Sequence, residues 1–295
     1  AVRLLKGDKG TSVTITIDQI TLNRPGTDVV IDSFPNEDPD LPDTDTITID
    51  LLEVQGLDNV LVVDGVEVPV GDYQNMRLSI IDEDIDASWV EEVGGARFPI
   101  KVPSEELKLG RFEVLDEGVQ TFVLEFNLAK ALTFNPKQNA DLSRYILKPR
   151  GVRIVDVGRA ALLGGSVDPD LFDGEPPCDG KLDPAVGNMV YLYQGHDLDL
   201  DALGDNYDPE LDPTAAATLA EPYAAETVGE DGAYLFAYLP AGAYTVAFSC
   251  DAIDDDADID DGIVIPSPEG QAAEISLDEG EELSCDFPLV GGQCG

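Results

Sequence analysis

Short runs of alternating apolar and polar residues follow one another along the chain, and they constrain the fold more than any other feature. Gly, Pro, Asn and Asp separate the runs, and these residues favour turns between strands. One stretch, NLAKAL (127–132), has the pattern of a helical turn. Such spacing predicts an antiparallel β-sandwich or barrel. The strands expected in the first half are 11–22, 47–56, 59–70, 76–84, 97–103, 110–116, 121–126 and 145–157.

The first of these runs, TSVTITIDQITL (11–22), changes phase along its length. Apolar residues occupy odd-numbered positions up to Ile17 and even-numbered positions from Ile20 onward. Because side chains alternate between the two faces of a strand, a slip of one residue requires an irregularity in the pairing. We therefore expect a β-bulge near Asp18–Gln19.

The second half continues as strands after a break rich in Pro, Asp and Gly at 167–180. We predict a first domain at 1–158, a linker at 159–180 and a second domain at 181–295. The fold class is expected to be all-β, with two consecutive antiparallel β-sandwich domains. The strands expected in the second domain lie in 187–195, 231–250 (two strands and a turn), 272–277 and 282–289.

Five longer motifs of the first half occur in a recognisable order: IDLLEVQG (49–56), VPVGDYQNMRLSI (68–80), IKVPSEELKL (100–109), FVLEFNLAKAL (122–132) and YILKPRGVRIVDV (145–157). With these motifs, residues 11–158 resemble the domain-of-unknown-function family numbered 4382, found in exported bacterial and archaeal proteins, often lipoproteins. The resemblance implies an exported β-sandwich and supplies no catalytic residues. The family usually opens with a strand leading into a Thr-Asp-Ala-Pro turn, which AVRLLKGDKG (1–10) lacks, so we expect the first strand to be missing.

The second half contains DGAYLFAYLPAGAYTVAF (231–248), a strand, a turn and a return strand. This motif resembles the transthyretin-like, Cna-B-type sandwich modules of bacterial surface proteins. The resemblance implies an immunoglobulin- or transthyretin-like fold and a place on the cell surface, but it does not identify a partner.

Acidic residues dominate the charge, with 60 Asp and Glu against 17 Lys and Arg and a net charge of -43. Residues 160–295 contain a single basic residue, Lys181, and 31 acidic ones. Such a field repels nucleic acid and anionic membranes, so we expect neither as a direct partner. No apolar run approaches the length of a membrane span. The first residue is Ala1, and without a signal peptide or lipid-attachment Cys the chain is expected to be a processed product.

The four cysteines, Cys178, Cys250, Cys285 and Cys294, all lie in the second half and form no CxxC pair. An even number confined to one domain predicts two disulfides in an oxidising, extracellular compartment. Three pairings exist. Strand phase directs Cys250 and Cys285 toward one core, which favours Cys250–Cys285 and leaves Cys178–Cys294.

Two acidic loops carry the only site chemistry that the sequence suggests. We refer to residues 196–212 as the first acidic loop and to residues 251–262 as the second. Closely spaced carboxylates and loop carbonyls supply the oxygens that calcium requires. The spacing does not fit an EF-hand, because Asp261 and Ser267 fall where Gly and Glu are required. The alternative is a solvated acidic loop. Candidate ligands are Asp197, Asp199 and Asp201, with Asp205 and Asp208 downstream, and Asp254, Asp256, Asp258, Asp260 and Asp261, with Asp255 beside them.

Catalysis has little support in the sequence. His196 is the only histidine and lies in an acidic loop without a Ser or Cys motif beside it, which argues against a nucleophile–His–acid arrangement. Among 60 acidic residues, some pair of carboxylates will always have the spacing that a two-carboxylate hydrolase needs, so such a pair is no evidence for catalysis. We therefore expect no enzyme. Trp89 and the tyrosines could stack on sugars, but the alternation favours core positions for most of them; the tyrosines are Tyr191, Tyr193, Tyr234, Tyr238 and Tyr244.

The sequence favours an extracellular structural or adhesive surface protein, with a calcium-stabilised filament built by strand addition between subunits as its most specific form. Val2, Leu4 and Leu5 would belong to the donor strand. An equally weighted alternative is that residues 1–6 pair within their own domain. The competing functions are a monomeric exported module that binds carbohydrate or calcium and, more distantly, a carboxylate-based hydrolase.

Overall fold

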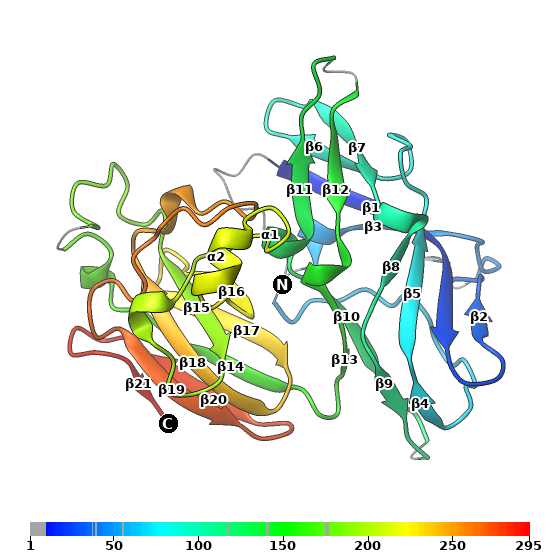
Figure 1. Cartoon of the computed structure of the whole chain (residues 1–295). Helices are drawn as coiled ribbons and strands as arrows, with labels where there is room; N and C mark the ends of the chain where they lie inside the picture. The colour runs from blue at the N-terminus through cyan, green and yellow to red at the C-terminus, as the bar shows by residue number, and fades with distance from the viewer. Residues whose placement is uncertain are drawn as a thin grey trace. The chain divides into compact units, whose positions relative to one another are not determined.

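The computed structural model of the chain describes residues 10–36, 38, 40–54, 56–116, 118–139, 142–174 and 177–295. These residues fold almost entirely as β-strands joined by turns and a few short helices (Figure 1). The chain divides between Val157 and Gly158 into two compact units. The all-β fold class predicted from the alternating pattern is confirmed.

The first unit is built around β1 (Gly10–Asn23), a 14-residue strand that pairs with four neighbours. Its ladder with β5 shifts register between Ile17 and Gln19, which confirms the bulge expected from the phase change. The shift lets Ile17 and Ile20 both face the core, where both are buried. The sheet runs β11-β12-β7-β6-β1-β5-β8, and β2 and β3 also pair with β1.

The remaining strands of the first unit have the following bounds. Those of the main sheet are β2 (Val29–Ile31), β3 (Ile47–Asp50), β5 (Asn75–Ile80), β6 (Trp89–Glu92), β7 (Arg97–Lys101), β8 (Glu106–Lys108), β11 (Leu132–Asn135) and β12 (Arg144–Leu147). Two further pairs are β4 (Gly71–Tyr73) with β9 (Phe112–Val114), and β10 (Phe122–Phe126) with β13 (Val152–Asp156). The expected helical turn is α1 (Leu128–Ala131).

Residues 59–70 do not form the strand that their alternation predicts. Gly65 has a φ of +63°, which is not strand geometry, and Pro69 has no N–H to donate to a ladder. Val62, Val63 and Val68 pack against the core of the first unit. Val60 and Val66 instead remain exposed, at 45% and 43%. The alternation therefore describes a segment laid over the core, not a paired strand.

The second unit is a sandwich of two four-stranded sheets. A continuous core that includes Val190, Phe236, Phe248 and Phe287 lies within the unit. One sheet runs β16 (Ala224–Thr227), β15 (Met189–Gln194), β18 (Gly242–Ser249), β19 (Ala272–Leu277). The other runs β17 (Ala233–Leu239), β14 (Ala161–Ser166), β20 (Glu282–Asp286), β21 (Gln293–Cys294). A short helix, α2 (Pro213–Thr218), follows the first acidic loop.

The segment predicted as a linker, 159–180, belongs to the second unit, and this corrects the sequence-based boundary. It contains β14, which lies between β17 and β20. Leu171 and Phe172 then add buried side chains to the core. β14 also contains two adjacent glycines, Gly164 and Gly165. A Cβ atom at Gly165 would collide with the carbonyl oxygen of Cys285, so close packing of the strands requires this glycine.

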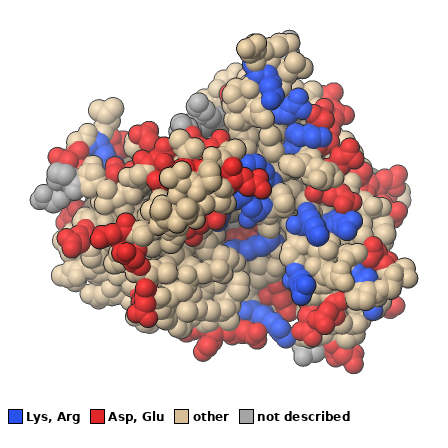
Figure 2. All heavy atoms as spheres, viewed as in Figure 1, with Lys and Arg blue, Asp and Glu red and all other residues tan. Residues whose placement is uncertain are grey.

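Charge is distributed unevenly between the units. In the view of Figure 2, most Lys and Arg side chains lie over elements of the first unit, whereas Asp and Glu are spread over both. No helix of the described residues has both the length and the apolar character needed to cross a membrane.

Candidate functional site

All four cysteines are in disulfides, but the pairing differs from the predicted one. The structure joins Cys178 to Cys250 and Cys285 to Cys294, so the predicted Cys250–Cys285 and Cys178–Cys294 pairing is wrong. Cys250 and Cys285 do point into one core, as strand phase suggested. Each nevertheless has a nearer partner, because Cys294 lies directly opposite Cys285 on β21 and the segment before β15 brings Cys178 to the end of β18.

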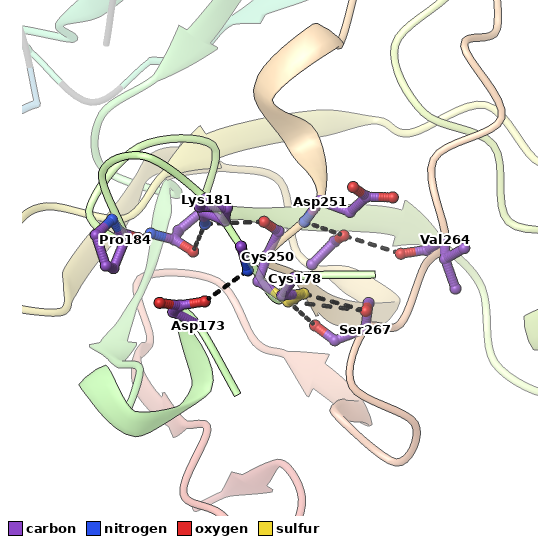
Figure 3. Close-up of a disulfide and its surroundings, with 11 residues drawn as sticks. Asp173, Cys178, Lys181, Pro184, Cys250, Asp251, Val264 and Ser267 are labelled. Carbon is purple, nitrogen blue, oxygen red and sulfur yellow. Dashed lines mark hydrogen bonds between the residues drawn. A yellow bond between two sulfur atoms is a disulfide. The ribbon is translucent and has the colours of Figure 1, made fainter. Parts of the chain in front are cut away.

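The Cys178–Cys250 disulfide lies beside the only basic side chain after Arg159 (Figure 3). The ammonium of Lys181 donates to Asn188 Oδ1 at 2.9 Å and to the Cys250 carbonyl at 3.0 Å. Burial lowers the pKa of Lys181 to about 8, although the carboxylates of Asp173, Asp251 and Asp183 oppose this shift. Lys181 thus connects the segment after Cys178 to the residue that directly follows β18.

The early part of the first acidic loop is held by a hydrogen bond to β19 and by a local turn. Asp197 donates its N–H to Glu274 Oε1 at 2.5 Å. Asp199 caps the 3-10 helix Leu200–Ala202 by accepting from the N–H of Asp201. All three aspartates, Asp197, Asp199 and Asp201, are exposed, and the structure does not bring them to the second acidic loop.

The second acidic loop folds back on itself in a tight turn. Asp256 donates its N–H to Asp261 Oδ2 at 2.7 Å and accepts from the N–H of Asp258 at 3.0 Å. Asp254 ends the 3-10 helix Ala252–Asp254 and is exposed. The charge of Asp260 acts on Asp205 of the first loop. The turn therefore places part of the predicted ligand set next to the later part of the first acidic loop.

Three buried side chains join the two loops, and we call them the buried acidic centre: Asp205, Asn206 and Asp255. Their exposed fractions are 0%, 1% and 1%. Asp255 Oδ2 accepts from Asn206 Nδ2 and from the hydroxyl of Tyr191, both at 2.7 Å. Asp255 Oδ1 accepts from the N–H of Asn206 at 3.2 Å. These bonds fix Asn206 between the two loops.

Asp205 is held by main-chain N–H groups at the end of the second acidic loop and just after it. Its Oδ2 accepts from the N–H groups of Asp261 and Ile263 at 3.0 and 3.2 Å. Nearby, the N–H of Asp208 donates to the carbonyl of Asp258 at 3.3 Å. The sequence placed Asp205, Asp208 and Asp255 only at the margins of its candidate set. Nothing in the spacing of these aspartates distinguishes the buried ones from the solvated ones.

The environment of the buried acidic centre disfavours the ionised form of both carboxylates. Burial raises the pKa of Asp205, and the neighbouring charges of Asp255 and Asp260 raise it further. Burial also raises the pKa of Asp255 to about 6, against the opposing effect of its hydrogen bonds from Tyr191 and Asn206. Desolvation disfavours the charged form of each acid.

Two oxygen atoms of this centre have no hydrogen-bond partner among the described residues: Asp205 Oδ1 and Asn206 Oδ1. No group of three or more Asp, Glu, His or Cys side chains in the described parts of the chain is arranged to hold a metal ion. What the structure brings together is two carboxylates and one amide. Such a set can bind a hard cation if main-chain carbonyls or water complete the coordination.

The tyrosines considered for sugar stacking lie in the interior, as expected. Tyr191, Tyr193, Tyr234 and Tyr244 are buried, and Tyr238 is 9% exposed. Trp89 is half-buried, with the guanidinium of Arg97 4.7 Å from its ring centroid. The proposed donor residues Val2, Leu4 and Leu5 lie outside the described residues.

Comparison with known proteins supports the resemblance found for the first half. Residues 6–149 match the family described as Domain of unknown function (DUF4382). No curated protein matches the chain. The Bacillus anthracis TIE protein matches at 9% identity and a TM-score of 0.23, over 99% of this chain and 56% of that one. A candidate cell adhesion protein from Bacteroides fragilis matches at 9% identity and a TM-score of 0.18, with 99% and 84% covered. Both scores are too low to support an argument about fold or function, and the chain spans only about half of the TIE protein.

Proposed function

We propose that this chain, whose residues 6–149 match the DUF4382 family, is an extracellular structural or adhesive protein of the cell surface. The observation that carries the proposal is the pair of disulfides in the second unit. Disulfides persist in oxidising compartments and are rare where glutathione keeps thiols reduced. A non-enzymatic role agrees with the sequence, which has one histidine and no nucleophile motif beside it.

The more specific form of the proposal is self-association into a filament through strand addition. The segment 57–70 of the first unit supports it, because this segment belongs to no strand and exposes apolar side chains. Gly65 and Pro69 prevent the segment from forming a strand itself, so it would act as an apolar surface against which an added strand from a second copy of the chain packs. The exposed residues are Leu57, Val60, Leu61, Val66 and Val70. The filament would be stabilised by calcium bound at the acidic loops of the second unit.

Negative-stain electron microscopy of the full chain tests the filament directly. In millimolar calcium we expect fibres, and after EDTA we expect them to fray or dissolve. Discrete particles under both conditions would overturn the filament and leave a monomeric surface module that binds calcium or carbohydrate.

A pair of substitutions tests the role of the exposed segment. Val60→Asp with Val66→Asp places two charges on the proposed pairing surface and should abolish fibres. Val119→Asp is the matched control, because Val119 is 96% exposed and lies outside the segment. Fibres that persist in the double variant would show that another surface makes the contact.

A further inference from the structure

The buried acidic centre contains two carboxylates, and no Lys or Arg among the described residues of the second unit is paired with either of them. Lys181 is the only basic residue after Arg159, and its ammonium is engaged by Asn188 and the Cys250 carbonyl. An ionised carboxylate that is buried without a compensating charge is strongly destabilising. Such a centre therefore needs a positive charge from outside the chain, or a proton.

The two unpartnered oxygen atoms favour a bound cation over a bound proton at this centre. Asp205 Oδ1 and Asn206 Oδ1 are buried acceptors without a donor among the described residues. A proton on Asp205 would neutralise one carboxylate and supply a single donor, but it would leave the carboxylate of Asp255 buried without a counter-charge. A cation satisfies a carboxylate oxygen and an amide oxygen together.

We propose that Asp205 Oδ1 and Asn206 Oδ1 are ligands of a calcium ion held between the two acidic loops. Calcium takes carboxylate, amide and main-chain carbonyl oxygens, whereas zinc prefers the nitrogen and sulfur ligands that this centre lacks. Asp255 is a positioning residue, because both its oxygens already accept hydrogen bonds from Asn206 and one also from Tyr191. Its carboxylate fixes the amide of Asn206 and adds negative charge beside the ion.

This inference deepens the calcium part of the proposed function, but it concerns a single chain and does not require a filament. Ion binding is measured on dispersed protein and assembly by microscopy, so either can fail alone. Calcium binding without fibres would overturn the filament only. Fibres without calcium binding would overturn this site only.

Calorimetric titration of the chelator-treated full chain with calcium is the first test. We expect saturable binding of one ion to this centre and, at a free calcium concentration of about 100 times Kd, a folded-to-unfolded ratio about 100-fold higher than without calcium. Terbium provides a second probe, because energy transfer from Tyr191 should sensitise its luminescence and calcium should compete with it. The absence of saturable binding would overturn the proposal.

The position of the ion can be tested by comparing the calcium affinity of Asp205→Asn with that of a matched control, Asp201→Asn. Both substitutions remove one charge from the first acidic loop, but Asp201 is exposed. We expect Asp205→Asn to weaken calcium binding at least tenfold and Asp201→Asn to leave it within about twofold. Equal affinity in the two variants would overturn the assignment.

Hydrogen exchange of the wild-type chain locates the ion without any substitution, in case Asp205→Asn does not fold. Calcium should slow exchange at the N–H groups of Asn206, Asp261 and Ile263, which donate to the two carboxylates. Protection confined to other segments would contradict the site.

Discussion

Cys178 and Cys250 close a loop with a sequence separation of 72 residues, and their Cα atoms lie 5.6 Å apart. The second disulfide, Cys285–Cys294, closes a loop with a separation of only 9. Because a disulfide restricts the unfolded chain more when its loop is longer, the first bridge should stabilise the second unit by about 4 kcal/mol and the second by about 3 kcal/mol. Calorimetric unfolding of the two double Cys→Ala variants should rank them in this order. The opposite ranking would show that packing at the cysteines outweighs loop closure.

Lys181→Met should destabilise the second unit by about 2 kcal/mol, because it removes the donor that satisfies Asn188 Oδ1 and the Cys250 carbonyl. Asn188 is fully buried, so water does not readily replace the lost bond. Urea denaturation provides the measurement. Lys108→Met is the control, since Lys108 is exposed on β8 and surface changes usually stay within about 0.5 kcal/mol. If the two substitutions lower the free energy of unfolding equally, the hydrogen bonds of the Lys181 ammonium do not contribute to stability.

The same lysine predicts a rise in stability with pH. Its folded-state pKa is lowered to about 8 from 10.5 by burial, so the unfolded chain binds more protons between these values, and stability rises with pH there. Because Lys181 is only half-buried, solvent screening reduces the gain to about 1 kcal/mol between pH 8 and 10.5. Denaturation of the wild type and of Lys181→Met across this range should show the free energy of unfolding of the wild type rising relative to that of the variant, because the raised pKa of Asp205 affects both proteins alike. A difference between the two proteins that does not change with pH would contradict the lowered pKa.

The strands and the bulge could be predicted because they depend on local alternation. The phase change between Ile17 and Ile20 was enough to locate the register shift in β1. β14 could not be predicted from local alternation, because its glycines, Gly164 and Gly165, reflect pairing with a strand more than 100 residues later in the sequence. The disulfide pairing depends likewise on which strands become neighbours. The buried acidic centre was missed for the same reason, because only the folded chain distinguishes Asp205 and Asp255 from the solvated aspartates around them.

Gly165→Ala should destabilise the second unit strongly, by about 3 kcal/mol, because the added methyl group would overlap the Cys285 carbonyl and force β14 away from β20. Gly164→Ala is a close control on the same strand. There the nearest atoms to an added Cβ are Leu235 Cδ1 at 3.4 Å and the Tyr234 carbonyl oxygen at 3.5 Å, an ordinary packing distance. Thermal unfolding of the two variants should therefore separate them by several degrees, with Gly165→Ala the less stable. If they unfold at the same temperature, β14 does not pack against β20 as closely as the structure has it, and the segment 159–180 would again be better described as a linker.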